Sequence, residues 1–236
     1  MLRRGRSPRP PAFHDRVDAG IQLADALRPV VEGIPARDLV VIGLTRGGVV
    51  TAAEVARELG ARLEALVVRK LGAPRQPELA IGAITAGGTR VLNRPLIEEL
   101  GLTEGDVEQI SLAGREAARA LASELGVPAQ VPGLTGKVGI VVDDGLATGA
   151  TMRVAVEAVR AQAAARVVVA VPVAPESLIG PFRTVADDVV AVIATNRLNA
   201  VGRWYLQFGD VRTPAVRLLL QASAADAAVP RDAPRT

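Results

Sequence analysis

One segment, residues 138–152, constrains this chain more than any other. An unbroken apolar run from Val138 to Val142 ends in two adjacent acids, Asp143 and Asp144, and a turn of Gly, Ala, Leu and Thr follows. The run reads as a buried strand, and its acids would lie at the carboxyl end, where open parallel sheets bind their ligands. The small turn residues would let backbone N–H groups surround an anion at the start of the next helix, which we expect over residues 153–165.

The residue types in this turn indicate the chemistry of the ligand. Thr148 and Thr151 add hydroxyl donors to the backbone amides. Two acids beside a phosphate cradle suit a ligand with a phosphate and either vicinal hydroxyls or a metal ion, and a sugar phosphate meets that description. A Walker loop is excluded because Ala150 follows Gly149 where Lys is required, and the glycine spacing does not fit a dinucleotide fingerprint. An ordinary strand–turn–helix with a polar turn is the structural alternative.

Length and composition bound the class of protein. A chain of 236 residues that is 49% hydrophobic can form one α/β domain with a sizeable core. The absence of cysteine excludes disulfides and thiolate metal sites, so we expect a cytoplasmic protein. No apolar run approaches the roughly 20 residues of a membrane span, and no signal-peptide core follows the first arginines, so no membrane association is expected.

The basic character of the chain is confined to its first eleven residues. Four arginines lie there without an acid, and without them 28 basic residues fall to 24 against 25 acidic ones. The folded part is therefore close to neutral, and no nucleic-acid partner is expected. We expect residues 1–11 to be a disordered basic Pro/Arg-rich tail, residues 12–222 to form the domain, and residues 223–236, rich in Ala, Pro and Asp, to form a second disordered tail.

Helical and apolar segments alternate between these tails, which predicts an α/β fold with a mainly parallel sheet flanked by helices. The expected strands are residues 39–44, 63–68, 137–142, 167–173 and 189–194. The expected helices are residues 13–31, 49–59, 103–125 and 211–222, besides the one after the opening turn. Residues 82–85 and 89–92 should form a hairpin across two glycines, and residues 69–80, polar with one internal glycine and two prolines, should form a long loop.

The turn after Val142 resembles the phosphoribosyl-pyrophosphate (PRPP) loop of the type I phosphoribosyltransferases, and the order of elements resembles their core with its small hood. The resemblance covers roughly residues 13–220 and is greatest for a group of bacterial phosphoribosyltransferase-like proteins of poorly defined substrate. The segments that carry it are residues 13–16, 19–20, 46–48, 68–74, 77–83 and 201–205. Two positions depart from the pattern: Thr45, where Pro is expected, and residues 195–198, where a Pro and an aromatic are more usual.

The resemblance implies where the ribose 5-phosphate part of PRPP would bind. Asp143 and Asp144 would hold the ribose 2- and 3-hydroxyls, either directly or through Mg²⁺. The metal ion would contact the two acids through water or substrate oxygens. The turn would hold the 5-phosphate, and the implied contacts are Gly145, Ala147, Thr148, Gly149, Ala150 and Thr151. Few direct protein ligands for the metal are expected, because Mg²⁺ retains water and seldom occupies an all-protein cage.

A second anion site is expected at residues 45–48, which follow the first strand and open a helix. Arg46, Gly47 and Gly48 would bind pyrophosphate through backbone amides and the guanidinium, although Arg-Gly-Gly alone could be a bland turn. Lys70 could neutralise pyrophosphate as it leaves, and Arg69 could contact the same group or the protein itself; a solvated charge pair at a strand end is the alternative. Arg46, Lys70, Asp143 and Asp144 are thus the catalytic candidates.

The acceptor site is less well defined by the sequence. Within the predicted loop, residues 71–80 would cover the reaction, and their one carboxylate, Glu78, could act as a base, fix the nucleophile or remain an exposed acid. Ala147 stands where 6-oxopurine enzymes of the resembled superfamily usually have an Asp next to the base, which makes hypoxanthine and guanine less favoured. Trp204 could stack on a planar acceptor within the hood, whereas Tyr205 and Phe208 fit better as a hydrophobic plug.

These features together predict a Mg²⁺-dependent phosphoribosyltransferase that joins the phosphoribosyl group of PRPP to an unidentified acceptor, nitrogen being favoured, and releases pyrophosphate. A non-catalytic PRPP-binding regulator is the main alternative, and a ribose-phosphate phosphatase or phosphorylase is a weaker one. The resemblance also implies that a homodimer is possible. The expected partners are PRPP and a small-molecule acceptor.

Overall fold

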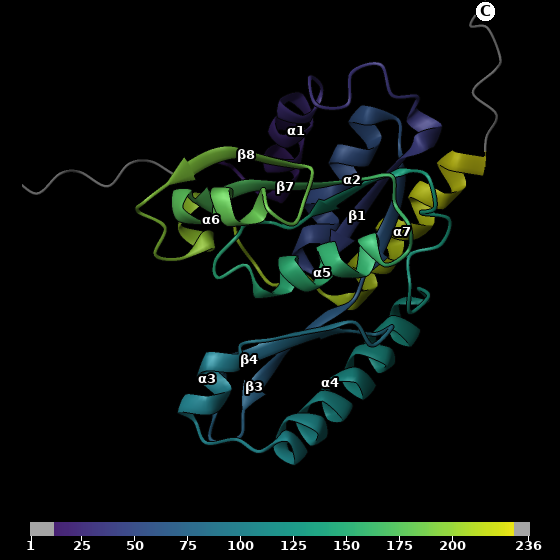
Figure 1. Cartoon of the computed structure of the whole chain (residues 1–236). Helices are drawn as coiled ribbons and strands as arrows, with labels where there is room; N and C mark the ends of the chain where they lie inside the picture. Colours follow the sequence, from purple (N-terminus) through teal and green to yellow (C-terminus); the bar gives the residue numbers. More distant parts are fainter. Residues whose placement is uncertain (1–11, 229–236) are drawn as a thin grey trace, which may run out of the picture.

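The computed structural model describes residues 12–228 and shows two lobes (Figure 1). The larger lobe contains a parallel sheet with the strand order β2-β1-β6-β7-β8. Its strands are β1 (Leu39–Leu44), β2 (Arg62–Leu66), β6 (Val138–Val142), β7 (Arg166–Pro175) and β8 (Asp188–Thr195). Strand β6, which carries the acid pair at its end, lies in the middle of this sheet, between β1 and β7. The predicted class, a mainly parallel sheet flanked by helices, is confirmed.

Helices cover both faces of the sheet because its apolar strands alternate their side chains between two cores. Even-numbered residues of β1, such as Val40 and Ile42, pack with helices α5 and α6, and odd-numbered ones, such as Val41, pack with α1 and α2. A strand buried on both faces must be apolar throughout, which explains the unbroken run of β6. The helices of this lobe are α1 (Arg16–Leu27), α2 (Gly47–Leu59), α5 (Ala150–Arg160), α6 (Glu176–Phe182) and α7 (Thr213–Ala228), with short 3-10 turns η1 (Ala36–Asp38) and η2 (Val201–Trp204).

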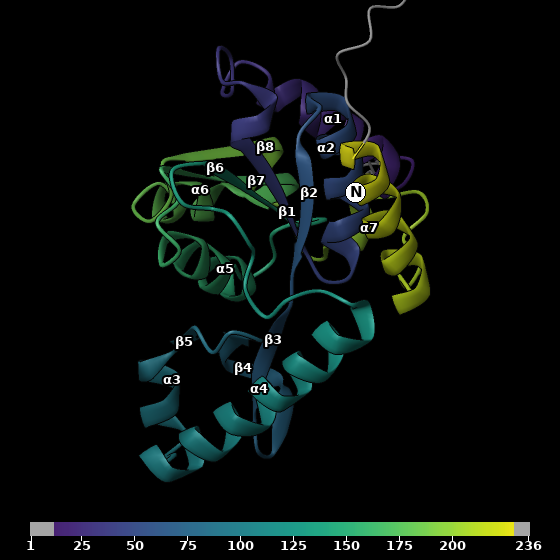
Figure 2. The ribbon, with the colours of Figure 1, turned by 90° about the vertical axis from the view of Figure 1, so that its right-hand side faces the viewer.

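The smaller lobe is the hood, and it is formed by the chain between β2 and β6 (Figures 1 and 2). It contains the antiparallel strands β3 (Val68–Ala73), β4 (Gln76–Thr85) and β5 (Arg90–Leu92), and helices α3 (Arg94–Glu99) and α4 (Glu104–Leu125). Thr103 caps α4, its hydroxyl accepting from the Asp106 amide while the Asp106 carboxylate accepts from Thr103. Trp204 lies past the last strand and packs with Phe13 and Tyr205 in the larger lobe, so the expectation that it belongs to the hood is wrong.

Residues 69–80, expected to be a long loop, form most of a β-hairpin, β3–β4. Leu71, Ala73 and Ile81 are buried with Val107 of α4, and this packing favours strands in a segment whose local sequence suggests a loop. Two of the residues that favour a loop, Gly72 and Pro74, fit into the hairpin at special positions. Pro74 lies in the two-residue turn, and Gly72 sits at a register irregularity where a side chain would meet Pro77 Cα at 2.9 Å.

Several boundaries also differ from expectation. The helix after the acid pair spans Ala150–Arg160 rather than residues 153–165. Gly149 is the residue at its N-cap, so the helix begins earlier than expected. The predicted strand 63–68 divides at Val67, where the chain leaves one sheet for the other. Residues 223–228, assigned to a disordered tail, continue α7, whereas 1–11 and 229–236 lie outside the described residues. No helix within residues 12–228 is long and apolar enough to cross a membrane.

Candidate active site

The acid pair lies where β1 and β6 end side by side. Because these strands pair in register with Gly43 opposite Val142, the turns that follow them meet at one edge of the sheet. A methyl group on Gly48 would approach the Asp143 Cα and Oδ1 to 2.8 Å. A methyl group on Gly47 would overlap Asp144 Oδ2 and lie 2.9 Å from the Asp144 Cγ. The turn expected to bind pyrophosphate is thus packed directly on the two acids.

Both carboxyl groups have pKa values above the ordinary aspartate value of 3.8. For Asp143 burial raises the pKa most, the neighbouring Asp144 charge raises it further, and Arg16 and Lys70 oppose this. For Asp144 burial again raises the pKa, and the hydrogen bond from Arg16 opposes it. Burial disfavours the charged form of both acids, so a cation or a hydroxyl donor that binds there would offset this cost, and such perturbed groups are often found at functional sites.

The turn after the acids ends at the start of α5. Gly149 is the residue before that helix, with φ +79°, and Phe182 of α6 packs so closely that a methyl group on Gly149 would lie 2.8 Å from its Cε2. Leu146 is buried and its amide donates to the Val173 carbonyl at 2.9 Å, which ties the turn to β7. Ala147 and Thr148 are exposed. The first amides of a helix have no partner within it, so an exposed turn here can accept an anion.

The two predicted cations of β3 line different cavities. Lys70 lines a cavity of about 500 Å³ that also touches Thr148, Gly149 and Ala150, and its charge lowers the pKa of Asp143. Arg69 lines a separate cavity of about 560 Å³ together with Thr45 and Arg46. Successive residues of a strand point to opposite faces, which accounts for the separation. Both side chains are exposed, and the peptide bond between Thr45 and Arg46 is cis.

One of the three predicted acceptor residues lines the cavity beside Lys70. Glu78 is exposed and lines the Lys70 cavity, whose walls do not include Ala147 or Trp204. Trp204 is half-buried and packs against the cluster of Phe13 and Tyr205. The Lys70 cavity instead has Asn93 and Arg153 among its polar walls, and the Arg153 guanidinium lies 5.5 Å from the centre of the Phe182 ring. No sequence pattern singles out Arg153, because helical position alone does not show which residues face the hood.

Sequence reasoning also missed Arg16 and Tyr205. Arg16 Nε donates to Asp144 Oδ2 at 2.7 Å, and the Tyr205 hydroxyl donates to the Asp144 backbone carbonyl at 2.5 Å. Burial raises the Tyr205 pKa, with the Asp144 charge adding to the shift, so its hydroxyl stays a donor. Both residues stand in segments that carry the family resemblance, residues 13–16 and 201–205, and that was the available signal.

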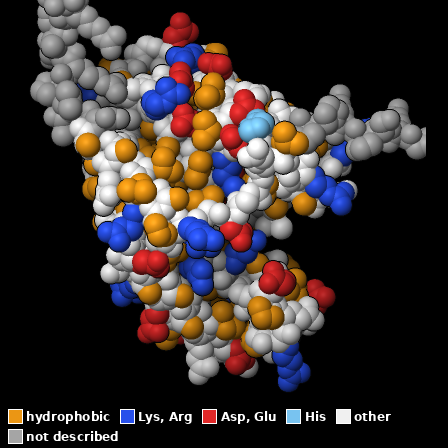
Figure 3. All heavy atoms as spheres, turned by 180° about the vertical axis from the view of Figure 1, so that it is seen from behind, with side chains coloured by type: hydrophobic (Ala, Val, Ile, Leu, Met, Phe, Trp, Pro, Cys, Tyr) orange, Lys and Arg blue, Asp and Glu red, His pale blue; other side chains and the backbone are white. Residues whose placement is uncertain are grey.

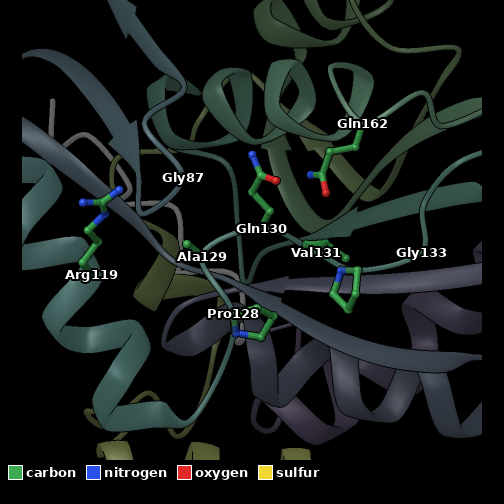
Figure 4. Close-up of a pocket in the computed structure, with 9 residues that line it drawn as sticks. Gly87, Arg119, Pro128, Ala129, Gln130, Val131, Gly133 and Gln162 are labelled. Atoms are coloured by element: carbon green, nitrogen blue, oxygen red, sulfur yellow. The ribbon is translucent and has the colours of Figure 1, made fainter.

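Two further surfaces lie apart from the acid pair. A further cavity of about 640 Å³ opens between the turn after β4, α4 and the linker to β6, and Arg119, Gln130 and Gln162 line it (Figure 4). None of the predicted site residues lines that cavity. On the face opposite that of Figure 1, Lys and Arg side chains lie along the waist between the lobes, and the sole histidine, His14, lies beside acidic side chains (Figure 3). His14 is exposed and its Nδ1 lies 3.1 Å from Asp15 Oδ2.

A metal ion would have few protein oxygens to bind directly. Within residues 12–228 there is no group of three or more His, Cys, Asp or Glu residues that could hold one. The hard donors at the site are the carboxylate oxygens of Asp143 and Asp144, which suit Mg²⁺ when substrate oxygens and water complete its shell. The two carboxylates are therefore donors of the kind that Mg²⁺ accepts.

Comparisons with known proteins agree with this geometry. Residues 14–203 match the family model described as the phosphoribosyl transferase domain. Two proteins of Mycobacterium tuberculosis, from strains CDC 1551 / Oshkosh and H37Rv and provisionally named phosphoribosyl transferases, are each 40% identical over 219 residues, or 91% of this chain. This chain spans about half the length of those relatives, 47%.

A solved structure gives the same result for the fold. The crystal structure of TT1426 from Thermus thermophilus superposes with a TM-score of 0.74 at 40% identity, over 89% of this chain and 98% of that one. The family match covers the acid pair, the turn that follows it, Arg16 and Lys70 alike. The chain belongs to the phosphoribosyl transferase family.

Proposed function

We propose that the protein transfers the 5-phosphoribosyl group of PRPP to a small nitrogen acceptor and releases pyrophosphate, in a reaction that requires Mg²⁺. The observation that carries the proposal is the direct packing of Gly47 and Gly48 on Asp144 and Asp143. A diol site and an anion site in contact across two neighbouring strands suit a ligand that carries pyrophosphate on C1 of a ribose and hydroxyls on the next two carbons, C2 and C3.

Each part of the site has a role in this reaction. Asp143 and Asp144 bind the ribose hydroxyls, and the turn from Gly145 to Thr151 binds the 5-phosphate with the start of α5. The pyrophosphate is bound by Arg46, Gly47 and Gly48. Arg69, which lines the same cavity as Arg46, adds positive charge there. Lys70, the exposed cation that acts on Asp143, neutralises the charge that develops on the leaving group.

The bond changes follow from the donor. The C1–oxygen bond of PRPP breaks and pyrophosphate leaves with the electron pair, while the acceptor nitrogen forms the new bond to C1 and loses a proton. The ribose ring carries positive charge during this step, and the nearby carboxylates stabilise it. A bound Mg²⁺ would supply charge neutralisation on the phosphate oxygens. Glu78 and Asn93, which line the Lys70 cavity, are available to an acceptor that enters from the hood.

The test is release of pyrophosphate from PRPP with Mg²⁺ against a panel of nucleobases and simple amines. The Asp143→Asn, Asp144→Asn double variant is the negative control, and Asp25→Asn, on exposed α1 surface, is the matched one. Acceptor-dependent release that the double variant loses supports a transferase. PRPP binding without release points to a regulator, and orthophosphate release or dependence to a phosphatase or phosphorylase. Failure of the wild type to bind PRPP contradicts the proposal.

A further inference from the structure

Two segments far apart in the chain meet beside the acid pair. Residues 12–16 and 204–209, here called the clasp, run alongside each other through a parallel bridge between Phe13 and Tyr205. The Leu206 amide donates to the Phe13 carbonyl at 2.9 Å, and the Gln207 amide donates to the His14 carbonyl at 2.8 Å. The clasp is therefore a hydrogen-bonded unit that lies outside both sheets.

The clasp holds Asp144 at two atoms. Tyr205 donates its hydroxyl to the backbone carbonyl, and Arg16 donates Nε to Oδ2 at 2.7 Å. Tyr205 is itself fixed between two rings, with its centroid 5.3 Å from that of Phe13 and 4.8 Å from that of Phe208. One contact sets the main chain of Asp144 and the other sets its carboxylate.

Arg16 is restrained more than an ordinary surface arginine. Its Nη1 donates to the Gly209 carbonyl at 2.8 Å, and its guanidinium carbon lies 3.8 Å from the centre of the Phe208 ring. Only 12% of its side chain is exposed. Three partners on a nearly buried guanidinium leave it one arrangement, so its Nε is held in place before any ligand binds.

This arrangement leaves one oxygen on each acid without a hydrogen bond from another residue. Oδ2 of Asp144 accepts from Arg16, and Oδ1 of Asp143 accepts from the Asp144 amide at 2.9 Å. Among residues 12–228, no other residue donates a hydrogen bond to the second oxygens, Oδ1 of Asp144 and Oδ2 of Asp143. A methyl group on Gly47 would lie 3.0 Å from Arg16 Nε, so the ion pair also packs against residues 45–48.

We propose that Arg16 is a positioning residue of the donor site: it occupies one oxygen of Asp144 and so presents the other oxygen to the ligand at a fixed distance from residues 45–48. The assignment rests on the proposed function, because it takes the ligand to be PRPP. Arg16 acts through Asp144. Phe208 and Gly209 in turn hold Arg16, which gives the segment after η2 a part in donor binding although it lies past the last strand.

A purely structural ion pair would affect stability without affecting the ligand, and the test separates the two. The variants are Arg16→Gln, Arg16→Lys and Phe208→Leu. The matched control is Arg28→Gln, which removes an arginine of the same region that pairs with Asp25 and Glu58 but is 51% exposed. Thermal unfolding and binding of PRPP with Mg²⁺ are measured for each, together with crystal structures of Arg16→Gln and the wild type.

We expect Arg16→Gln to weaken PRPP binding by about 10- to 100-fold, as for other residues that orient a ligand-binding group. Arg16→Lys should recover part of this, and Phe208→Leu should weaken binding by about two- to fivefold. Arg28→Gln should bind as the wild type does. In the crystal of Arg16→Gln the Asp144 carboxylate should turn away from its wild-type position.

Equal or tighter binding of PRPP by Arg16→Gln would overturn the inference, as would an Asp144 carboxylate that stays in place. The crystal comparison needs no ligand, so it decides the positioning role even if the wild type does not bind PRPP. In that case the proposed function fails, and an Asp144 that turns in the variant still assigns Arg16 its role toward the carboxylate.

Discussion

Gly47 and Asp144 lie so close that no side chain fits between them. They belong to turns after two different strands, and a methyl group on Gly47 would lie 2.9 Å from the Asp144 Cγ and overlap Oδ2. The contact joins residues 45–48 to the acid pair without any intervening group. A change in one turn must therefore displace the other, and this makes the contact a sensitive place to test the site.

Gly47→Ala should weaken PRPP binding by about 100-fold, because a displacement of the order of 1 Å in a positioning group has effects of that size. It should also lower the free energy of unfolding by about 1–3 kcal/mol through overpacking. Gly105→Ala is the matched control, since its methyl group would meet only the Thr103 hydroxyl at 3.7 Å. Isothermal titration and urea unfolding measure the two effects, and unchanged binding in Gly47→Ala would contradict the shared site.

Lys70→Ala should reduce turnover by about 100-fold and reduce PRPP affinity much less, because a cation that meets the leaving group acts mainly in the transition state. Arg75→Ala, at the exposed tip of the same hairpin, should leave both quantities unchanged. Steady-state kinetics with the acceptor found in the panel separates kcat from KM. An equal loss for the two variants would show that Lys70 has no special role.

Removal of Mg²⁺ by a chelator should abolish pyrophosphate release, and added Mg²⁺ should restore it. Titrated alone, Mg²⁺ should bind weakly, because no group of three acidic or histidine ligands lies within residues 12–228. With PRPP present, binding should become much tighter, since the phosphate oxygens complete the metal's shell. Tight binding of Mg²⁺ to the free protein would be inconsistent with this view of the site.

Gly149→Ala should destabilise the turn before α5. The residue has φ +79°, which costs a non-glycine residue about 1–2 kcal/mol, and its methyl group would lie 2.8 Å from the Phe182 ring. PRPP binding should weaken as the start of α5 shifts. Gly180→Ala in α6, where no heavy atom lies within 4 Å of the added methyl group, is the control. Equal free energies of unfolding in urea for the two variants would contradict the predicted strain at residue 149.

Glu64→Gln should raise the melting temperature at pH 7. Burial raises the pKa of Glu64 above its ordinary value of 4.5, and Arg62, 3.4 Å away, offsets only part of this. Because the folded-state pKa is the higher one, the charged group opposes folding once the pH exceeds the unfolded value. The difference between wild type and variant should therefore shrink as the pH falls below 4.5. Exposed Glu116→Gln should show little of this trend, and a lower melting temperature for Glu64→Gln at pH 7 would refute it.

Predictions from the local sequence were correct where a residue pattern is compatible with only one type of secondary structure. The boundaries of β1 are as expected, residues 39–44, because six consecutive apolar residues between polar ones fit a strand buried on both faces. The prediction for residues 69–80 was wrong because Gly72, Pro74 and Pro77 favour a loop locally. Burial of Leu71 and Ile81 against α4, which comes later in the chain, outweighed that preference.

The sequence by itself determined the acid pair, the glycine turns and the family, since these are short runs whose residue types directly serve backbone geometry and anion binding. Tertiary structure alone decided which groups share the site. Arg16 reaches Asp144 across 128 positions of the chain, Tyr205 reaches it across 61, and Arg69 and Lys70 face different cavities although they are adjacent. Such contacts depend on how the strands are ordered and how the lobes pack, and no local pattern records that order.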